Sequence, residues 1–306
     1  MADFSHQPEA LQQPPGHDRI RTEEDLTHQV HGPLGTMSVV PDNYVGPMPA
    51  GAVRQSDYHR MTSVYGNIAS GHSQVQFDTS NFFKTGDNKD KDLSLLDDPM
   101  GYLKAMGEAA AFKQQYMHFV QDLVKTPAGL QMLETLDQSK TTTKIERADP
   151  GNGNVTQAAV SEDSIVQPDG SHGKGTSSQI WVDPTAKDWD AESCHSGVQP
   201  WMADRPRFGF YHELVHAYHN SRGDAAVSPH GHGQTLCSDP HDLAWPIVET
   251  EWQTAGLGPY AGSAVSENAI RAQMGGPQRP TYSGGTYEDW KQQQDAEEPP
   301  QRSPHR

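Results

Sequence analysis

The chain has 306 residues, 23 basic and 40 acidic side chains, a formal net charge of −17 and 33% hydrophobic residues. This length permits one large domain or two small ones, and the apolar fraction lies below the roughly 45–50% of an average globular protein. An acidic chain without a basic stripe is a poor candidate for binding nucleic acid, and no stretch reaches the roughly 18–20 apolar residues of a membrane span. Two cysteines are too few for a disulfide framework or a four-cysteine zinc site.

Both ends of the chain are polar. Residues 1–88 are rich in Gln, Pro, Gly, His, Asp and Ser, and their apolar residues come in twos at most. Residues 284–306 are polar and rich in proline. Such compositions cannot offset the entropy lost in ordering a core. We therefore expect residues 1–88 to be disordered or loosely ordered, residues 89–283 to form the folded domain, and residues 284–306 to be a disordered tail.

Two amphipathic helices begin the foldable part. Apolar residues at three- and four-residue steps predict the first helix. They are Leu96, Met100, Leu103, Met106, Ala110, Phe112, Tyr116, Phe119 and Leu123. Thr126 and Pro127 form the start signal of the second helix. We expect both apolar stripes to lie in the core.

Two strands are expected after these helices. Residues 140–146 (KTTTKIE) alternate and are rich in threonine, and residues 177–182 (SSQIWV) form a second strand-like run. Residues 150–175, between them, are rich in Gly, Asn, Asp and Ser. This composition predicts a long loop.

The most informative segment is 206–223 (PRFGFYHELVHAYHNSRG), which a proline and a glycine delimit as a helix. His212 and His216 are four residues apart, a rise of about 6 Å that returns to nearly the same helix face, so both imidazoles can reach one metal ion. Glu213 follows His212 and can act as general base on a water molecule beside that ion. The uncharged flanking residues favour a buried metalloprotease helix over an ordinary amphipathic helix that carries two histidines.

A catalytic zinc ion usually takes three protein ligands, so one more is needed. His219 lies a further 4–5 Å or so along the helix, too far to share an ion with His212. Glu249 and Glu251 lie in a segment that reads as a helix ending at a glycine. Because they are two residues apart they point to different faces, so at most one of them can ligate, and helical geometry alone does not choose.

Several other polar residues have a simpler interpretation. His230, His232 and His241 lie in a segment rich in Gly, Ser and Pro and are expected to be solvated. Cys194 and Cys237 could pair, but nothing in the sequence decides it.

Two features follow the last glutamates. Ser266 is expected to cap a short helix, on which Glu267 and Arg271 have the i,i+4 spacing of a surface ion pair of little energetic weight. Arg279 and Tyr282 come next, and either could stabilise the oxyanion that forms during peptide hydrolysis.

The order of several short sequence blocks along the chain resembles that of the NleD-like family of zinc metalloproteases. Members of this family are effectors that type III secretion systems of bacterial pathogens inject. The resemblance covers roughly Leu95 to Tyr282, in the blocks TPAGLQML, GTSSQIWVDP, FYHELVHAYHNSRGD, ETEWQTAGL, SENAIR and RPTY. It implies an α+β, zincin-like domain, mainly helical, with a small sheet whose edge strand flanks the active-site helix. That edge strand would be residues 177–182 and would hold an extended substrate by strand addition.

The resemblance also selects Glu251 as the third ligand, with Glu249 and Glu267 as the remaining candidates. We expect one Zn²⁺ ion per chain on His212, His216 and Glu251, with Glu213 as general base and Tyr282 at the oxyanion. The expected protein is a monomeric endopeptidase, secreted into a host cell, whose partner there is a protein substrate. A secretion chaperone is a further partner that the resemblance allows.

Two other functions compete with this one. A metal-stabilised interaction module that does not cleave its partner would need the histidines but not Glu213. A nucleophilic enzyme built on Cys194 and His195 is disfavoured, because adjacent residues rarely form such a dyad.

Overall fold

The fold is that of a computed structural model. The structure describes residues 27–85, 91–189, 197–227, 248–282 and 285–297. Contacts divide the chain into two units, Met1–Tyr58 and His59–Arg306. Helix α2 (Gln55–Ser70) begins in the first unit and continues in the second.

The first unit contains a three-stranded sheet. Its strands are β1 (His28–Gly32), β2 (Gly35–Val40) and β3 (Ala52–Arg54), with β1 antiparallel and β3 parallel to β2. Leu34, Val39 and Val40 are buried. The expectation of a disordered or loosely ordered segment over residues 1–88 is therefore wrong for residues 28–85, where strands and α2 form. Few apolar residues are present, but Leu34, Val39 and Val40 are still removed from solvent where the strands pair.

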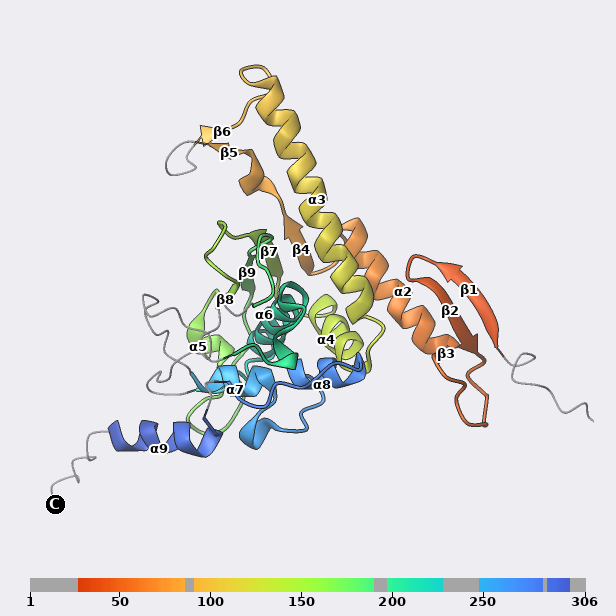
Figure 1. Ribbon diagram of the computed structural model, residues 1–306, viewed down its shortest axis with the longest axis vertical. Helices are drawn as coiled ribbons and strands as arrows, with labels where there is room; N and C mark the ends of the chain where they lie inside the picture. Colours follow the sequence, from red (N-terminus) through yellow and green to blue (C-terminus); the bar gives the residue numbers. More distant parts are fainter. Residues whose placement is uncertain (1–26, 86–90, 190–196, 228–247, 283–284, 298–306) are drawn as a thin grey trace, which may run out of the picture. The chain divides into compact units, whose positions relative to one another are not determined.

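The second unit has a four-stranded sheet in the order β4-β7-β9-β8 (Figure 1). The strands are β4 (Val75–Asp78), β7 (Thr143–Arg147), β8 (Val155–Ala158) and β9 (Ser178–Val182). Strands β4, β7 and β9 are parallel, and β8 runs antiparallel to β9. The two strands expected from the sequence are confirmed as β7 and β9, whereas β8 and the short helix α5 (Ser161–Ser164) replace part of the expected loop.

The edge position was assigned to the wrong strand. Residues 178–182 pair with β7 on one side and β8 on the other, so they lie inside the sheet. In the described residues the edge nearest helix α6 (Arg205–Arg222) is β8, which packs against that helix. The buried Ile180 and Val182 of β9 are typical of an interior strand, and β8 is short and polar.

Helix α6 is the central element of this unit. It contacts β8 and β9 on one side and the helices α4, α5, α7 and α8 elsewhere (Figure 1). The other helices are α3 (Pro99–Leu123), α4 (Pro127–Asp137), α7 (Glu249–Ala255), α8 (Glu267–Gln273) and α9 (Tyr287–Glu297). Among the described residues, no helix combines the length and apolar character that crossing a membrane requires.

Short elements complete the chain. They are η1 (Ser80–Phe83), β5 (Lys84–Thr85), β6 (Lys91–Asp92), η2 (Pro200–Met202) and η3 (Gly258–Tyr260). Strands β5 and β6 pair antiparallel.

Helix α3 divides into two halves with different environments. Phe112, Tyr116, Phe119 and Leu123 are buried, as expected. The earlier apolar residues are not core: Leu96 is 91% exposed and Met100 76%, and Leu103, Met106 and Ala110 are also exposed. The apolar periodicity runs along the whole helix, but Ala105 and Ala109 are the buried residues of its N-terminal half, whereas the large buried side chains lie in its C-terminal half.

The C-terminal tail also contains structure that the composition did not predict. Trp290 on α9 is buried, and its ring centroid lies 5.8 Å from that of Trp252 on α7. The ring of Tyr287 packs edge-on against Trp252 as well. Two aromatic side chains thus fasten α9 to the helix that carries Glu251, although most of the other residues of α9 are polar.

The C-terminal end of α6 is held by close backbone packing. Gly223 ends the helix in the left-handed conformation, with φ 69°, and a Cβ there would collide with the carbonyl oxygen of Gly173. A Cβ at Gly175, whose φ is 77°, would likewise collide with the carbonyl oxygen of Ser221. Both positions require glycine for its conformation and for space.

Candidate metal centre

Both histidines of the HELVH segment lie on one face of α6. The helix begins at Arg205 with Pro206 in its first turn and ends at Gly223, in agreement with the predicted bounds. Its uncharged residues Phe210, Tyr211, Leu214, Val215 and Ala217 are fully buried, which explains why so polar a segment forms an interior helix. His212 is buried with them, at 7% exposure.

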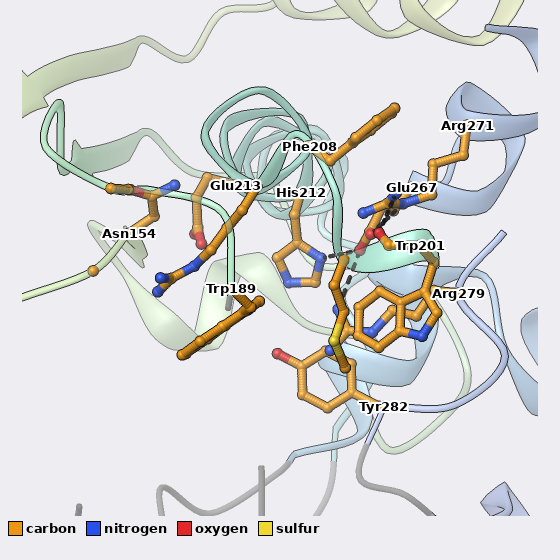
Figure 2. A pocket seen from close by; sticks show the side chains of 15 residues that line it. Asn154, Trp189, Trp201, Phe208, His212, Glu213, Glu267, Arg271, Arg279 and Tyr282 are labelled. Atoms are coloured by element: carbon orange, nitrogen blue, oxygen red, sulfur yellow. Dashed lines mark hydrogen bonds and ion pairs between the residues drawn. The ribbon is translucent and has the colours of Figure 1, made fainter. Parts of the chain in front are cut away.

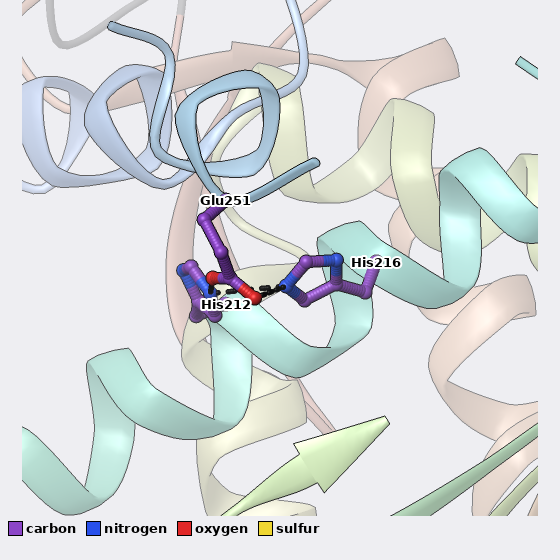
Figure 3. A group of neighbouring side chains, drawn as sticks. All are labelled: His212, His216 and Glu251. Carbon is purple, nitrogen blue, oxygen red and sulfur yellow. Dashed lines mark hydrogen bonds and ion pairs between the residues drawn. The ribbon is translucent and has the colours of Figure 1, made fainter. Parts of the chain in front are cut away.

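Helix α7 brings Glu251 to these histidines (Figure 3). Its Oε2 lies 2.9 Å from Nε2 of His212, and its Oε1 lies 3.3 Å from Nε2 of His216. The two Nε2 atoms are 3.1 Å apart. One ligand atom from each residue lies within 4.8 Å of the others, so this group could hold a metal ion.

The charges around His212 stabilise a cation at this point. Burial by itself lowers the pKa of His212, but hydrogen bonds to Glu251 and Glu267 outweigh it and raise the pKa to about 10. Burial raises the pKa of Glu251, yet His216 and His212 hold it well below its ordinary value. The same two carboxylates would stabilise a metal cation bound at this point.

The other nitrogen of each histidine is also engaged. His212 Nδ1 lies 2.9 Å from Oε2 of Glu267, and His216 Nδ1 lies 3.1 Å from Oγ1 of Thr254. Such contacts fix the ring orientation and the tautomer of a ligating histidine. Glu267 therefore approaches the side of His212 that faces away from Glu251.

Glu267 and Arg271 form a buried ion pair, so the expectation of a surface pair is wrong. Their side chains are 2% and 5% exposed, and Arg271 Nε donates to Glu267 Oε1 at 2.7 Å. Ser266 caps α8 as expected, accepting from the backbone N–H of Ala269. The i,i+4 spacing gave the pairing correctly, but burial depends on α8 packing against α4 and α6.

The Glu213 carboxylate lies beside the histidines and points into the neighbouring pocket (Figure 2). It is 7% exposed, and Oγ1 of Thr156 on β8 donates to its Oε2 at 2.7 Å. Burial raises the pKa of Glu213, although His212 and His216 pull it down. A carboxyl group with a raised pKa binds a proton more readily than an exposed one.

Tyr282 faces the same site (Figure 2). Its ring centroid lies 6.0 Å from that of His212. Burial raises the pKa of its phenol well above 10, and the charge and hydrogen bond of Glu251 raise it further, so the phenol keeps its proton. Arg279, the other oxyanion candidate, lies 4.0 Å above the Tyr282 ring and 3.3 Å from Glu267, where it supports both side chains.

The remaining predicted candidates lie elsewhere. His219 Nδ1 is 2.8 Å from Asp224 Oδ1, which agrees with a structural role outside the metal group. Glu249 accepts hydrogen bonds from the phenols of Tyr260 and Tyr287, both at 2.8 Å, and so points away from the histidines. The further histidines and both cysteines lie outside the described residues: His195, His230, His232, His241, Cys194 and Cys237.

Two hollows meet at the metal group. One, of about 260 Å³, runs along the first turns of α6 and is walled by Trp189, Trp201 and Phe208 (Figure 2). The other, of about 350 Å³, runs between β8 and α7. His212, Glu213 and Tyr282 line both hollows, so a chain lying across the site would have room on either side.

Sequence reasoning missed two contacts. Thr254 lies three residues after Glu251, and that spacing on a helix was a usable signal that the two share a face. Thr156 carried no such signal, because its segment was interpreted as a loop.

The chain is similar to one known protein family. The Peptidase_M91 family model, described as "effector protein", matches residues 101–282, more than half of the chain. The match includes α6, α7 and α8, and with them every residue of the metal group. No curated protein and no solved structure matches the chain.

Proposed function

The chain belongs to the Peptidase_M91 family of effector proteins, and from that premise we propose that it is a zinc-dependent endopeptidase that cleaves proteins of a target cell. The observation that carries the proposal is the convergence of His212, His216 and Glu251, with Glu213 directly beside them. Two histidines and one carboxylate are a common ligand set of catalytic zinc.

The spacing of the three residues is compatible with one shared metal ion, zinc included. Zinc–nitrogen bonds of about 2.0–2.1 Å in a tetrahedron place neighbouring ligand atoms about 3.3 Å apart. The two Nε2 atoms are 3.1 Å apart, and the two oxygens of Glu251 lie 2.9 Å from one and 3.3 Å from the other, which is close to that value. The group is therefore compact enough for its three residues to share one ion.

The proposed mechanism needs three metal ligands, one general base and one donor to the oxyanion. His212, His216 and Glu251 would hold the zinc ion, which when bound supplies Lewis acidity toward water and the scissile carbonyl. Glu213 takes a proton from the attacking water as the new carbon–oxygen bond forms. It then gives that proton to the amine as the carbon–nitrogen bond breaks. The protonated phenol of Tyr282 donates a hydrogen bond to the developing oxyanion.

Secretion, the substrate and a chaperone are proposed from the sequence resemblance and from the description of the family. We place the chain among the NleD-like members, secreted by a type III system into a host cell, with a protein substrate there and a secretion chaperone before export. Residues 89–283 are proposed as the metallopeptidase domain of a monomeric protein.

A metal-stabilised interaction module remains the alternative function. The histidines and Glu251 would serve it equally well, but a buried carboxylate beside them would serve no purpose in it. The presence of Glu213 therefore favours catalysis.

The deciding experiment compares wild type with Glu213→Gln, with the exposed-site variant Glu108→Gln as control. Zinc content is measured by metal analysis and cleavage by proteomics of a cell lysate. We expect one zinc ion per chain in all three proteins and cleavage products everywhere except with Glu213→Gln. Wild type that binds zinc but cleaves nothing would favour the interaction module, and a chain without zinc would end both proposals.

A further inference from the structure

Thr156 lies in the middle of β8, the edge strand beside α6. Along β8 the exposure alternates: Val155 and Gln157 are exposed, and Thr156 and Ala158 are partly covered. Successive side chains of a strand point to opposite faces, so Thr156 and Ala158 share one face. Since β8 packs against α6, the Thr156 side chain reaches the helix.

The Thr156 hydroxyl makes two contacts with one residue. Its Oγ1 lies 2.7 Å from Oε2 of Glu213 and 3.0 Å from the backbone oxygen of Glu213. Within the described residues, Thr156 is the one hydrogen-bond donor to this carboxylate. The hydroxyl thus ties the end of the glutamate side chain to the turn of the helix from which it comes.

This contact limits the freedom of a long side chain. A glutamate has three rotatable bonds, and holding it in one rotamer costs up to about 2 kcal/mol of conformational entropy, which a hydrogen bond to a fixed partner offsets. A hydroxyl that engages Oε2 leaves Oε1 to face the reacting water. A displacement of about 1 Å in a catalytic group is enough to slow a reaction severely.

We propose that Thr156 is the positioning residue of the Glu213 carboxylate, and that it ties this base to the strand along which an extended substrate would pair. The inference rests on the proposed function, because it presumes that Glu213 acts on a water molecule. It assigns to β8, the outermost strand of this sheet in the part of the chain that the structure describes, a second role through one side chain. Binding of substrate along β8 and alignment of the base thereby depend on the same four residues.

Three variants test the inference in the full chain. Thr156→Val keeps the shape of the side chain and removes the hydroxyl, and Thr156→Ser keeps the hydroxyl. Thr176→Val is the matched control, because its hydroxyl accepts from the backbone N–H of Val160 just beyond β8 and does not touch Glu213. Each protein is assayed for zinc content, melting temperature, kcat and KM on a peptide that wild type cleaves.

We expect Thr156→Val to lower kcat roughly 10- to 100-fold with KM within about twofold, at unchanged zinc content. Thr156→Ser should restore most of kcat, and Thr176→Val should behave as wild type. Wild-type kcat in Thr156→Val, or a loss that Thr156→Ser does not restore, would overturn the inference while the proposed function stands. Wild type without any peptidase activity would overturn the proposed function itself.

Discussion

Nδ1 of His212 lies 2.9 Å from Oε2 of Glu267, and both side chains are buried. With a metal ion on Nε2, the proton of the ring must be on Nδ1, which then donates to this carboxylate. Arg271 and Arg279 approach the same carboxylate from α8 and from the segment after it. Glu267 therefore connects the His212 ring to two cations that keep the carboxylate ionised.

Replacement of Glu267 by Gln should weaken the metal site and the fold together. We expect zinc affinity to fall about 10- to 100-fold, the usual effect of losing the partner of a ligating histidine. The free energy of unfolding should fall by about 3–5 kcal/mol, since Arg271 loses its buried counter-charge. Metal titration and urea unfolding measure the two effects, and Glu108→Gln, in an exposed pair with Lys104, should change neither. An unchanged zinc affinity would show that the contact does not orient His212.

Two glutamates on α7 offer a matched comparison. Glu251→Gln should lower zinc affinity by more than about 100-fold, since even indirect partners of a site contribute 10- to 100-fold. Glu249→Gln should leave zinc affinity unchanged and reduce only stability, because Glu249 accepts from Tyr260 and Tyr287. Competition with a chelating dye measures both affinities. The reverse order of the two variants would refute Glu251 as third ligand.

Tyr282→Phe isolates the phenol. The ring and its contact with Arg279 remain, so folding and zinc content should be unchanged. We expect kcat to fall by about 100-fold, as for the loss of one oxyanion donor. Steady-state kinetics with a wild-type substrate measure this effect, and an unaltered kcat would remove Tyr282 from the mechanism.

The two halves of α3 can be compared by replacing one leucine with alanine in each half. Leu103 is 55% exposed and Leu123 is fully buried. Leu103→Ala should change the free energy of unfolding by less than about 0.5 kcal/mol, and Leu123→Ala should lower it by about 2–5 kcal/mol. Chemical denaturation measures both. Equal losses would mean that the first half of the helix is covered in solution.

Asp224 gives the stability a defined pH dependence. Burial raises its pKa, but hydrogen bonds and charges from His219 and Arg222 outweigh it and hold the pKa below the ordinary value of 3.8. A carboxyl group with a depressed folded-state pKa contributes stability above its unfolded-state pKa and loses it as the pH falls further. Wild type should therefore be more stable than Asp224→Asn at pH 7, and the difference should shrink below about pH 4. Thermal melting across this pH range tests it, and a constant difference would contradict the linkage.

The sequence predicted what depends on local spacing. Four-residue spacing placed His212 and His216 on one helix face, and the glycine after α6 marked its end. It could not tell which strand is outermost, because that depends on partners far along the chain: β9 pairs with β7 and β8. It also placed Leu103 in the core, because helical periodicity records an apolar face but not what covers it.

The choice of Glu251 as the proposed third ligand needed more than helical geometry. Glu249 and Glu251 differ by about 200° around α7, and only the packing of α7 on α6 decides which carboxylate meets the histidines. Residue spacing within a helix cannot contain that information. The resemblance to a family supplied it, and the contacts of Glu249 with two tyrosines give the physical reason.

The glycines at the end of α6 have a consequence for how mutations would be tolerated. Gly175 and Gly223 touch neither the metal group nor its hollows, yet any side chain at either position collides with backbone on the other side. In a scan of all single substitutions, both positions should appear as intolerant as His212. A map of essential positions would therefore mark the backbone contacts that hold the end of α6 as well as the proposed metal group.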